Sequence, residues 1–363
     1  MEHKFPDAAD AIPAIPAAAP GQPLFCCFLV QRPADLQLPD RPLPEVVRGM
    51  TWLPRSELPS GDVCIRVQFS SLNYKDALAA EGHPGVVRQW PHVPGIDAAG
   101  IVEASHSDQW KPGDEVLVTG YELGAGHWGG WSQYIQVPAE WVVRKPAELS
   151  LRQAMSFGTA GFTAALCLRE LQRHDVQPHK RPVVVTGASG GVGCLAVALL
   201  AKLGYPTIAV TGKEAAHDWL RRLGATQVWT REQLLALDRD RPMLSAQFGG
   251  AVDTVGGRAL EVLIRSLDVN GCVAACGMVA GHELALTVYP FILRGARLSG
   301  ITSALCPRPL RLEIWDRLAG EWNLAELDRL VTEIGMENVD DYVGRIRHGN
   351  LQGRVLISIP AGQ

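Results

Sequence analysis

The chain has 363 residues, of which 47% are hydrophobic and 20% charged, and its formal net charge at pH 7 is −4. This length is too great for one ordinary hydrophobic core and predicts two domains. The sequence has no run of basic residues, which excludes a nucleic-acid partner. No stretch approaches the length of apolar residues that a membrane span requires, so we expect no membrane partner.

Residues 1–22 are rich in Pro and Ala, and we expect them to form a disordered extension. The eight cysteines are scattered, and no Cys-x-x-Cys pair occurs. This usage predicts reduced thiols and a cytoplasmic location.

Residues 23–150 consist of short β-type runs, such as 62–69 and 114–118, separated by Pro and Gly turns. They predict a mostly β domain, which the final strand at 353–359 is expected to rejoin. The glycine-rich stretch 124–130 is interpreted as a flexible loop over a cleft. We expect helices at 308–319 and 324–334, and we assign the whole of 304–363 to this domain.

Residues 151–303 have a different pattern, in which β-type runs at 183–187, 206–211, 250–255, 271–276 and 297–301 alternate with helical segments. Such alternation predicts a doubly wound parallel sheet with helices on both faces, and therefore an α/β protein. The helices are expected at 191–203, 214–223 and 258–267, with a further short strand near Val228.

A glycine-rich turn lies between the first of these strands and its helix. Ser189, Gly190, Gly191 and Val192 follow an apolar strand and open an apolar helix. Backbone amides at such a helix start favour a pyrophosphate, so we predict a dinucleotide site. The alternative is a glycine turn that only allows close helix packing.

The end of the next strand indicates which nucleotide binds. An Asp or Glu there would accept hydrogen bonds from a ribose 2′-hydroxyl, whereas this chain has Thr211, Gly212 and Lys213. A hydroxyl, an amide and an ammonium group suit a 2′-phosphate, so the predicted cofactor is NADPH. In the alternative, Lys213 is a solvated surface residue and Glu214 is the ribose acceptor.

Two further stretches bear on the chemistry. No cysteine cluster occurs, and residues 93–100 read Val-Pro-Gly-Ile-Asp-Ala-Ala-Gly without a His-Glu pair, so we expect no metal site. In the polar stretch 70–78, Asn73, Tyr74 and Asp76 are candidates to point into a cleft, where a phenol can hydrogen-bond a carbonyl. The alternative is a polar cap on a short helix.

These segments together resemble the zinc-independent acryloyl-CoA reductase branch of the medium-chain dehydrogenase/reductase superfamily, whose members are also called quinone oxidoreductases. The resemblance begins near Gly61. It rests on the motifs at 70–78, 94–100, 127–130, 158–164, 185–193, 253–256, 271–277, 290–294 and 352–354.

The resemblance implies a GroES-like β catalytic domain and a Rossmann nucleotide domain, with the active cleft where they meet. It implies that Tyr74 contacts the cofactor and acts in catalysis together with Asn73. The further cofactor contacts that it implies are Ser189, Gly190, Gly191, Val192, Thr211, Gly212, Lys213, Gln227, Met278, Ile292, Ser303 and Asn350. The family usually has arginine at position 213 and often at position 227, so Lys213 and Gln227 predict weaker NADPH binding.

The implied activity is NADPH-dependent reduction of the C=C bond of a small α,β-unsaturated acyl-CoA. A quinone or free enone is the alternative acceptor, and a non-catalytic NADPH-binding protein is the alternative of another class. A valine-rich strand near Leu298 could pair at a sheet edge, so a homodimer is expected.

Overall fold

The computed structural model describes residues 22–32 and 46–361, so nearly all of the predicted N-terminal extension lies outside the described residues. The chain forms two compact units. The first, called here the β unit, comprises Met1–Gly158, Thr332–Leu351 and Val355–Gln363. The second, called here the nucleotide unit, comprises Thr159–Val331 and Gln352–Arg354.

The nucleotide unit extends further along the chain than the expected 151–303. Helix α2 (Leu151–Arg173) has a non-helical residue at Gly158, with φ of 51°, and the units divide directly after it. Residues 304–331, which we expected in the β domain, group instead with the parallel sheet. One reason is that buried Trp315 of helix α8 (Arg308–Ala319) stacks on Phe162 with the ring centroids 6.0 Å apart.

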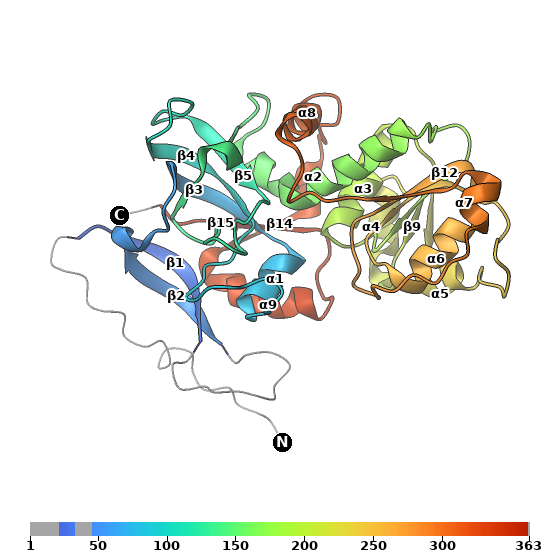
Figure 1. Cartoon of the computed structure of the whole chain (residues 1–363), viewed down its shortest axis with the longest axis horizontal. Helices are drawn as coiled ribbons and strands as arrows, with labels where there is room; N and C mark the ends of the chain where they lie inside the picture. The colour runs from blue at the N-terminus through green and yellow to red at the C-terminus, as the bar shows by residue number, and fades with distance from the viewer. Residues whose placement is uncertain (1–21, 33–45, 362–363) are drawn as a thin grey trace, which may run out of the picture. The chain divides into compact units, whose positions relative to one another are not determined.

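The β unit is built on a mainly antiparallel sheet with the strand order β14-β15-β3-β4-β5-β7, and β6 also pairs with β3 (Figure 1). A separate antiparallel pair is formed by β1 and β2. Strand β15 pairs with β3, which confirms that the final strand returns to this sheet. The elements are β1 (Leu24–Gln31), β2 (Val47–Pro54), β3 (Val63–Leu72), α1 (Tyr74–Ala80), β4 (Asp97–Ser105), β5 (Glu115–Thr119), β6 (Tyr134–Val137), β7 (Val143–Arg144), β14 (Val331–Gly335), α9 (Val339–Arg347) and β15 (Arg354–Ser358).

The nucleotide unit contains a parallel sheet with the order β10-β9-β8-β11-β12-β13. Counted along the chain this is the 3-2-1-4-5-6 order of a doubly wound fold, as predicted. Helix α6 lies beside the sheet (Figure 1), and its apolar side chains share one buried cluster with Val184, Ala251 and Val273. The elements are β8 (Val183–Thr186), α3 (Gly191–Lys202), β9 (Thr207–Val210), α4 (His217–Arg222), β10 (Gln227–Trp229), α5 (Arg231–Leu235), β11 (Phe248–Asp253), α6 (Gly257–Arg265), β12 (Leu267–Ala275), α7 (Tyr289–Arg294) and β13 (Arg297–Gly300).

One expectation about the helices is wrong. The helix expected at 324–334 is a short 3-10 turn, Leu327–Leu330, followed by strand β14. Leu327 and Leu330 are both buried, a spacing of three that suits one 3-10 turn, and the β-branched residues that follow favour a strand. Helices α5, α7 and α9 were not predicted from the sequence.

The glycines of 124–130 allow backbones to pack closely rather than forming a free loop. The amide nitrogens of Gly129 and Gly130 donate to the carbonyl oxygens of Val93 and Gly95, both at 2.7 Å. A Cβ atom at Gly129 would lie 2.4 Å from the Gly95 carbonyl oxygen. This segment is therefore held against residues 93–95 of its own unit.

Candidate functional site

The glycine-rich turn follows β8, whose four residues are all buried. Gly187 has φ of 58°, and a Cβ atom there would lie 2.2 Å from Thr254 Oγ1. A Cβ atom on Gly193 would lie 2.3 Å from the Gly187 carbonyl oxygen. These two glycines therefore bring α3 close to the strand, as the packing interpretation expected.

The start of α3 has the features that an anion requires. Its N-cap is Gly190, which has no side chain to occupy the first amides of this 12-residue helix. Unpaired amides and the positive end of the helix dipole favour a phosphate group at this position. Close packing and phosphate binding are thus compatible uses of the same turn, and the residues present fit a dinucleotide.

The structure joins the glycine turn to the Thr211-Gly212-Lys213 loop. Ser189 Oγ lies 2.9 Å from Thr211 Oγ1, and both side chains are buried. The Lys213 backbone nitrogen donates to Thr211 Oγ1 at 3.1 Å. Partial burial lowers the pKa of the Lys213 ammonium group. The side chains predicted for the pyrophosphate and the 2′-phosphate regions therefore belong to one hydrogen-bonded group.

An arginine that the sequence analysis missed lies beside this loop. Arg231 begins α5, and its Nη2 atom lies 3.4 Å from the position that a Cβ atom on Gly212 would take. The exposed Gln227 lies at the first position of β10, where its side chain accepts a hydrogen bond from Trp229 Nε1 at 3.0 Å. A guanidinium thus stands near the loop although positions 213 and 227 both lack arginine. No sequence motif marks it, because only the β10–α5 connection brings it there.

The remaining predicted contacts in the nucleotide unit lie after β12. Met278 follows this strand and is 70% exposed, and Ile292 on α7 is 73% exposed. The Ser303 carbonyl oxygen accepts a hydrogen bond from Arg311 Nη2 at 3.0 Å. Their contacts with a cofactor stay predictions.

A second arginine approaches α3 from the C-terminal segment of the same unit. Arg354 is buried, and its Nη1 atom lies 3.1 Å from the position of a Cβ atom on Gly191. The neighbouring Gly353 amide donates to the Ser189 carbonyl oxygen at 3.0 Å. Residues 352–354 therefore brace the glycine turn, and the Arg354 guanidinium adds positive charge to it.

In the β unit, Asn73 is the N-cap of α1, which agrees with the helix-cap alternative. Asn73 and Asp76 form a capping box, and the side-chain Nδ2 atom of Asn73 also donates to Asp97 Oδ2 at 2.8 Å. Ser71 Oγ donates to the same Asp97 oxygen at 2.5 Å. This network fixes the start of α1, where Tyr74 is the first residue.

Asp76 is fully buried in this network, where the Ile96 amide donates to its Oδ1 atom at 2.7 Å. Burial, and then the nearby charge of Asp97, raise the pKa of Asp76 to about 7. The Asp76 carboxylate is therefore used in holding the backbone, whereas Tyr74 is exposed.

Tyr74 is 40% exposed and contacts an arginine of α9. Arg347 Nη1 donates to the Tyr74 hydroxyl oxygen, and the guanidinium lies 4.8 Å from the centre of the Tyr74 ring. Arg347 Nε also donates to Glu81 at 2.8 Å. Asn350, the other predicted cofactor contact in this unit, is exposed just after α9.

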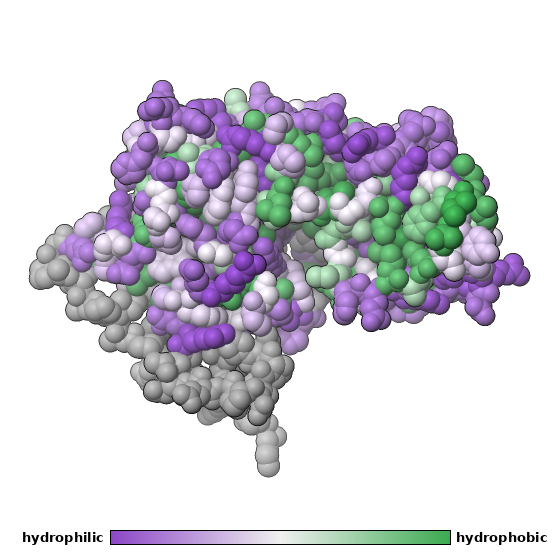
Figure 2. Space-filling model, in the orientation of Figure 1, coloured by the Kyte–Doolittle hydropathy of each residue, from purple (hydrophilic) through white to green (hydrophobic). Residues whose placement is uncertain are grey.

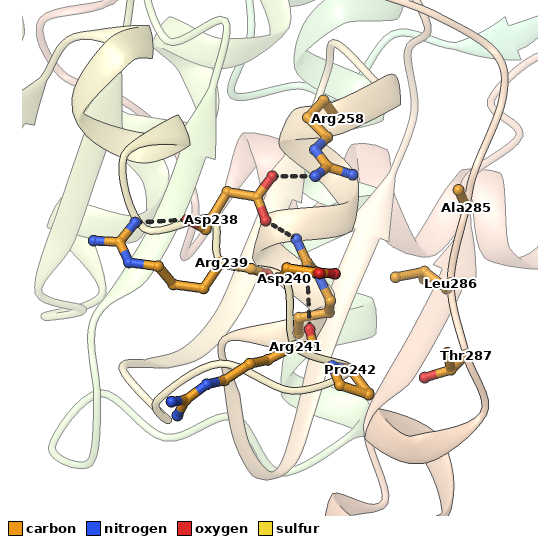
Figure 3. A pocket seen from close by; sticks show the side chains of 10 residues that line it. Asp238, Arg239, Asp240, Arg241, Pro242, Arg258, Ala285, Leu286 and Thr287 are labelled. Atoms are coloured by element: carbon orange, nitrogen blue, oxygen red, sulfur yellow. Dashed lines mark hydrogen bonds and ion pairs between the residues drawn. The ribbon is translucent and has the colours of Figure 1, made fainter.

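A pocket of about 810 Å³ lies elsewhere in the nucleotide unit, between the 238–242 loop, α6 and residues 285–287 (Figure 3). Asp238 forms an ion pair with Arg258 (Figure 3) and a second one with Arg265. Arg265 Nη1 also donates to the Arg241 carbonyl oxygen at 2.9 Å. The pocket contains none of the predicted site residues, and its buried arginine is engaged in holding the loop.

Within residues 22–32 and 46–361, no group of three or more His, Cys, Asp or Glu side chains is arranged to hold a metal ion. Over the same ranges, no helix combines the length and apolar character needed to cross a membrane.

Known protein families match both units. The alcohol dehydrogenase GroES-like domain matches residues 59–147, and the zinc-binding dehydrogenase family matches residues 191–315. The chain is 43% identical over 306 residues to the acrylyl-CoA reductase AcuI of Ruegeria pomeroyi, covering 84% of this chain and 92% of that protein. It is also 43% identical over 305 residues to YhfP of Bacillus subtilis, a protein named as a quinone oxidoreductase, covering 84% of this chain and 92% of YhfP.

Solved structures agree with this similarity. The yhdH oxidoreductase of Salmonella enterica, solved in complex with NADP, has a TM-score of 0.87 and 40% identity and covers 92% of this chain and 100% of its own. The yhfP protein of Bacillus subtilis, solved with NAD bound, has a TM-score of 0.86 and 39% identity and covers 92% of this chain and 99% of its own.

A doubly wound nucleotide fold and a GroES-like β fold in one chain define the class of medium-chain oxidoreductases. Within it, the chain belongs to the medium-chain dehydrogenase/reductase superfamily, in the branch that contains AcuI and YhfP. The predicted family and α/β fold are thereby confirmed.

Proposed function

We propose that this protein is an NADPH-dependent reductase of the C=C bond of a small α,β-unsaturated acyl-CoA. One observation carries the proposal: the chain is 43% identical to an acrylyl-CoA reductase over 92% of that protein. The geometry of the nucleotide unit supports the cofactor, because the uncapped start of α3 is joined to Thr211 by hydrogen bonding.

The proposed cofactor residues have distinct tasks. Ser189, Gly190, Gly191 and Val192 hold the pyrophosphate through the turn and the amides of α3. Thr211, Gly212 and Lys213 hold the 2′-phosphate, with Arg231 beside them. We propose that the remaining contacts with NADPH are made by Met278, Ile292, Ser303, Asn350 and Tyr74. Gln227 is proposed as a further contact at the edge of the NADPH site.

Bound NADPH would supply the hydride for the β-carbon of the substrate. Tyr74 is proposed to hydrogen-bond the thioester carbonyl, where negative charge develops as the C=C bond is reduced. Asn73 acts on the position of Tyr74, because it caps the helix that begins with this residue. Arg347 donates to the Tyr74 hydroxyl oxygen, which leaves the phenolic proton free to face a substrate.

A quinone or free enone is the second candidate acceptor, because the similarity to YhfP is as high as that to AcuI. The test is NADPH oxidation by the purified protein with acryloyl-CoA, crotonyl-CoA and a benzoquinone as acceptors. We expect the highest kcat/KM with acryloyl-CoA, and a higher value with benzoquinone would favour the second candidate. NADPH binding without oxidation by any acceptor would favour a non-catalytic protein.

A homodimer is proposed from the edge of the parallel sheet. Strand β13 lies at this edge, and exposed apolar residues lie before it in the chain, on the surface near α7 (Figure 2). Besides the proposed cofactor contacts, between 40% and 63% of each residue is exposed in the set Val279, Leu284, Val288, Tyr289 and Leu293. Light scattering should give twice the mass of the chain, and Leu293→Glu should shift it towards the monomer.

The proposed location is the cytoplasm. All eight cysteines are free in the structure, and most are buried, which suits a reducing compartment. Fractionation of cells that express the tagged protein tests this location.

A further inference from the structure

A buried arginine of α8 holds an irregular segment at the carboxyl end of the parallel sheet. Residues 301–307 connect β13 to α8 without forming a helix or a strand. Arg311 is fully buried, and its Nη2 atom donates to the carbonyl oxygens of Ser303 and Ala304, both at 3.0 Å. Because Nη2 carries two N–H bonds, it has one donor for each carbonyl group. Arg311 therefore fixes two consecutive peptide groups of the segment.

The side chain of Arg311 is itself held in place by aromatic rings of α2 and α8. Its guanidinium carbon lies 5.1 Å from the centre of the Phe162 ring, on α2. The same ring stacks on Trp315, which lies one turn further along α8. Hydrogen bonds from a charged donor are strong in such a dry environment, and buried carbonyl groups that lose them are costly. Arg311 is therefore a rigid support for the backbone of residues 303–304.

The opposite side of this segment is available to a ligand. In a trans peptide group the N–H bond points away from the C=O bond, so the amides of Ala304 and Leu305 point away from Arg311. Within the described residues, neither of these two amides donates a hydrogen bond. Ser303 is half-buried and Leu305 is 70% exposed, so a bound molecule can reach this side of the segment.

The strand order indicates which half of NADPH this segment meets. The order changes direction between β8, which the glycine-rich turn follows, and β11. A dinucleotide crosses the carboxyl ends of the strands at such a point, with its two nucleotide halves on opposite sides. The loop proposed for the 2′-phosphate follows β9, so we expect the nicotinamide half on the side of β11, β12 and β13. Ser303 follows β13, and the nearby Ile301 amide donates to the Ala275 carbonyl oxygen, at the end of β12, at 2.9 Å.

We propose that Arg311 is a positioning residue for hydride transfer, because it holds the backbone of residues 303–304 in place for the nicotinamide half of NADPH. This inference rests on the proposed function, which assigns Ser303 to the cofactor site. Because Arg311 is fully buried, it acts through the segment rather than by touching the cofactor. Loss of the guanidinium group releases both peptide groups, so the nicotinamide half loses its fixed orientation while the adenosine half stays bound.

The experiment compares two ligands of the whole protein by titration calorimetry: NADPH, and 2′,5′-ADP, which has the 2′-phosphate but no nicotinamide. Arg311→Met removes the hydrogen-bond donors. It should raise the Kd for NADPH about tenfold and leave the Kd for 2′,5′-ADP within about twofold of the parent value. The kcat with acryloyl-CoA at saturating NADPH should fall as well, by about tenfold. Arg311→Lys, which keeps a charged donor, should restore part of the NADPH affinity.

Trp315→Phe is the matched control, because the Trp315 Nε1 atom is buried and has no hydrogen-bond partner among the described residues. It loosens the same contact between α2 and α8 but keeps Arg311, so it should lower Tm and leave both Kd values unchanged.

The proposal is overturned if Arg311→Met weakens both ligands equally or neither, or if Trp315→Phe weakens NADPH as much. Both Kd values are measured without an acceptor, so a failure of the proposed acyl-CoA reduction would be seen separately. Should Arg311→Met not fold, Arg311→Lys provides the same comparison of the two ligands.

Discussion

Tyr74 has an exposed hydroxyl on a helix start that is otherwise rigid. Its oxygen accepts a hydrogen bond from Arg347, and Asn73 and Asp76 fix the backbone around it. If this hydroxyl stabilises developing charge on the substrate carbonyl, Tyr74→Phe should lower kcat for acryloyl-CoA by about 10²-fold, with little change in the Kd for NADPH. Stopped-flow turnover and fluorescence titration measure the two quantities.

The control for this substitution is Tyr342→Phe. Tyr342 lies on α9, where Arg345 is 4.4 Å from the centre of its ring, so the same atom is removed from a comparable environment. Its kcat should match that of the parent protein. A Tyr74→Phe protein with the parental rate would remove Tyr74 from the chemistry.

Positions 213 and 227 lack arginine, but Arg231 places a guanidinium group near the same loop. Its guanidinium approaches Gly212, within the loop proposed to bind the 2′-phosphate. Arg231→Ala should raise the KM for NADPH about tenfold and leave the KM for NADH nearly unchanged, because only NADPH has this phosphate. Arg221→Ala, which removes an exposed arginine paired with Asp218, should change neither value. Equal effects of Arg231→Ala on both cofactors would contradict the assignment.

At the scale of elements, the β8–α3 turn depends on a close approach of two backbones. An alanine at Gly193 would put Cβ 2.3 Å from the Gly187 carbonyl oxygen, so α3 would have to move. Gly193→Ala should reduce the free energy of unfolding by about 1–3 kcal/mol and weaken NADPH binding. Urea denaturation and cofactor titration measure these effects.

A glycine with free space around it gives the comparison. Gly344 lies inside α9, and no atom outside its own helix lies within 4 Å of the Cβ position. Gly344→Ala should therefore leave stability unchanged or raise it by up to about 1 kcal/mol. Equal losses at both positions would mean that the contact with Gly187 is not the cause.

An element can be predicted from the sequence when the pattern that specifies it lies within its own residues. The strands and helices from 183 to 300 alternate with clear apolar periodicity, so the sheet was predicted nearly to its ends. Helix α9 was not predicted, because its buried residues Val339 and Val343 pack in the core of the β unit against partners distant in sequence. In the site, Ser189 and Thr211 were predicted from motifs, whereas Arg231 and Arg347 depend on tertiary contacts that no motif encodes.

At the scale of the whole molecule, two buried groups affect stability with opposite signs. Burial lowers the pKa of His92 to about 4. Below pH 6.5 this histidine is therefore protonated in the unfolded chain but stays neutral in the native state. His92 therefore reduces stability as the pH falls. Asp76, with a pKa raised to about 7, binds a proton in the native state that the unfolded chain releases, so it reduces stability as the pH rises from 4 to 7.

Removal of the His92 titration should be visible in acid. Relative to the parent protein, His92→Gln should gain about 2 kcal/mol in the free energy of unfolding between pH 7.5 and pH 5, whatever its absolute stability. Chemical denaturation at the two pH values provides the measurement. A constant difference between variant and parent would mean that His92 has the same pKa in the native and the unfolded state.

The pairing of β15 with β3 has a consequence for synthesis on the ribosome. Residues 355–358 pair with residues 69–72, so the sheet of the β unit lacks a strand until the last part of the chain emerges. The parallel sheet between 183 and 300 is complete much earlier. We expect ribosome-bound chains that expose residues up to 340 to resist protease across 183–300 while 63–72 is cut. The order of assembly would then be the reverse of the order of translation.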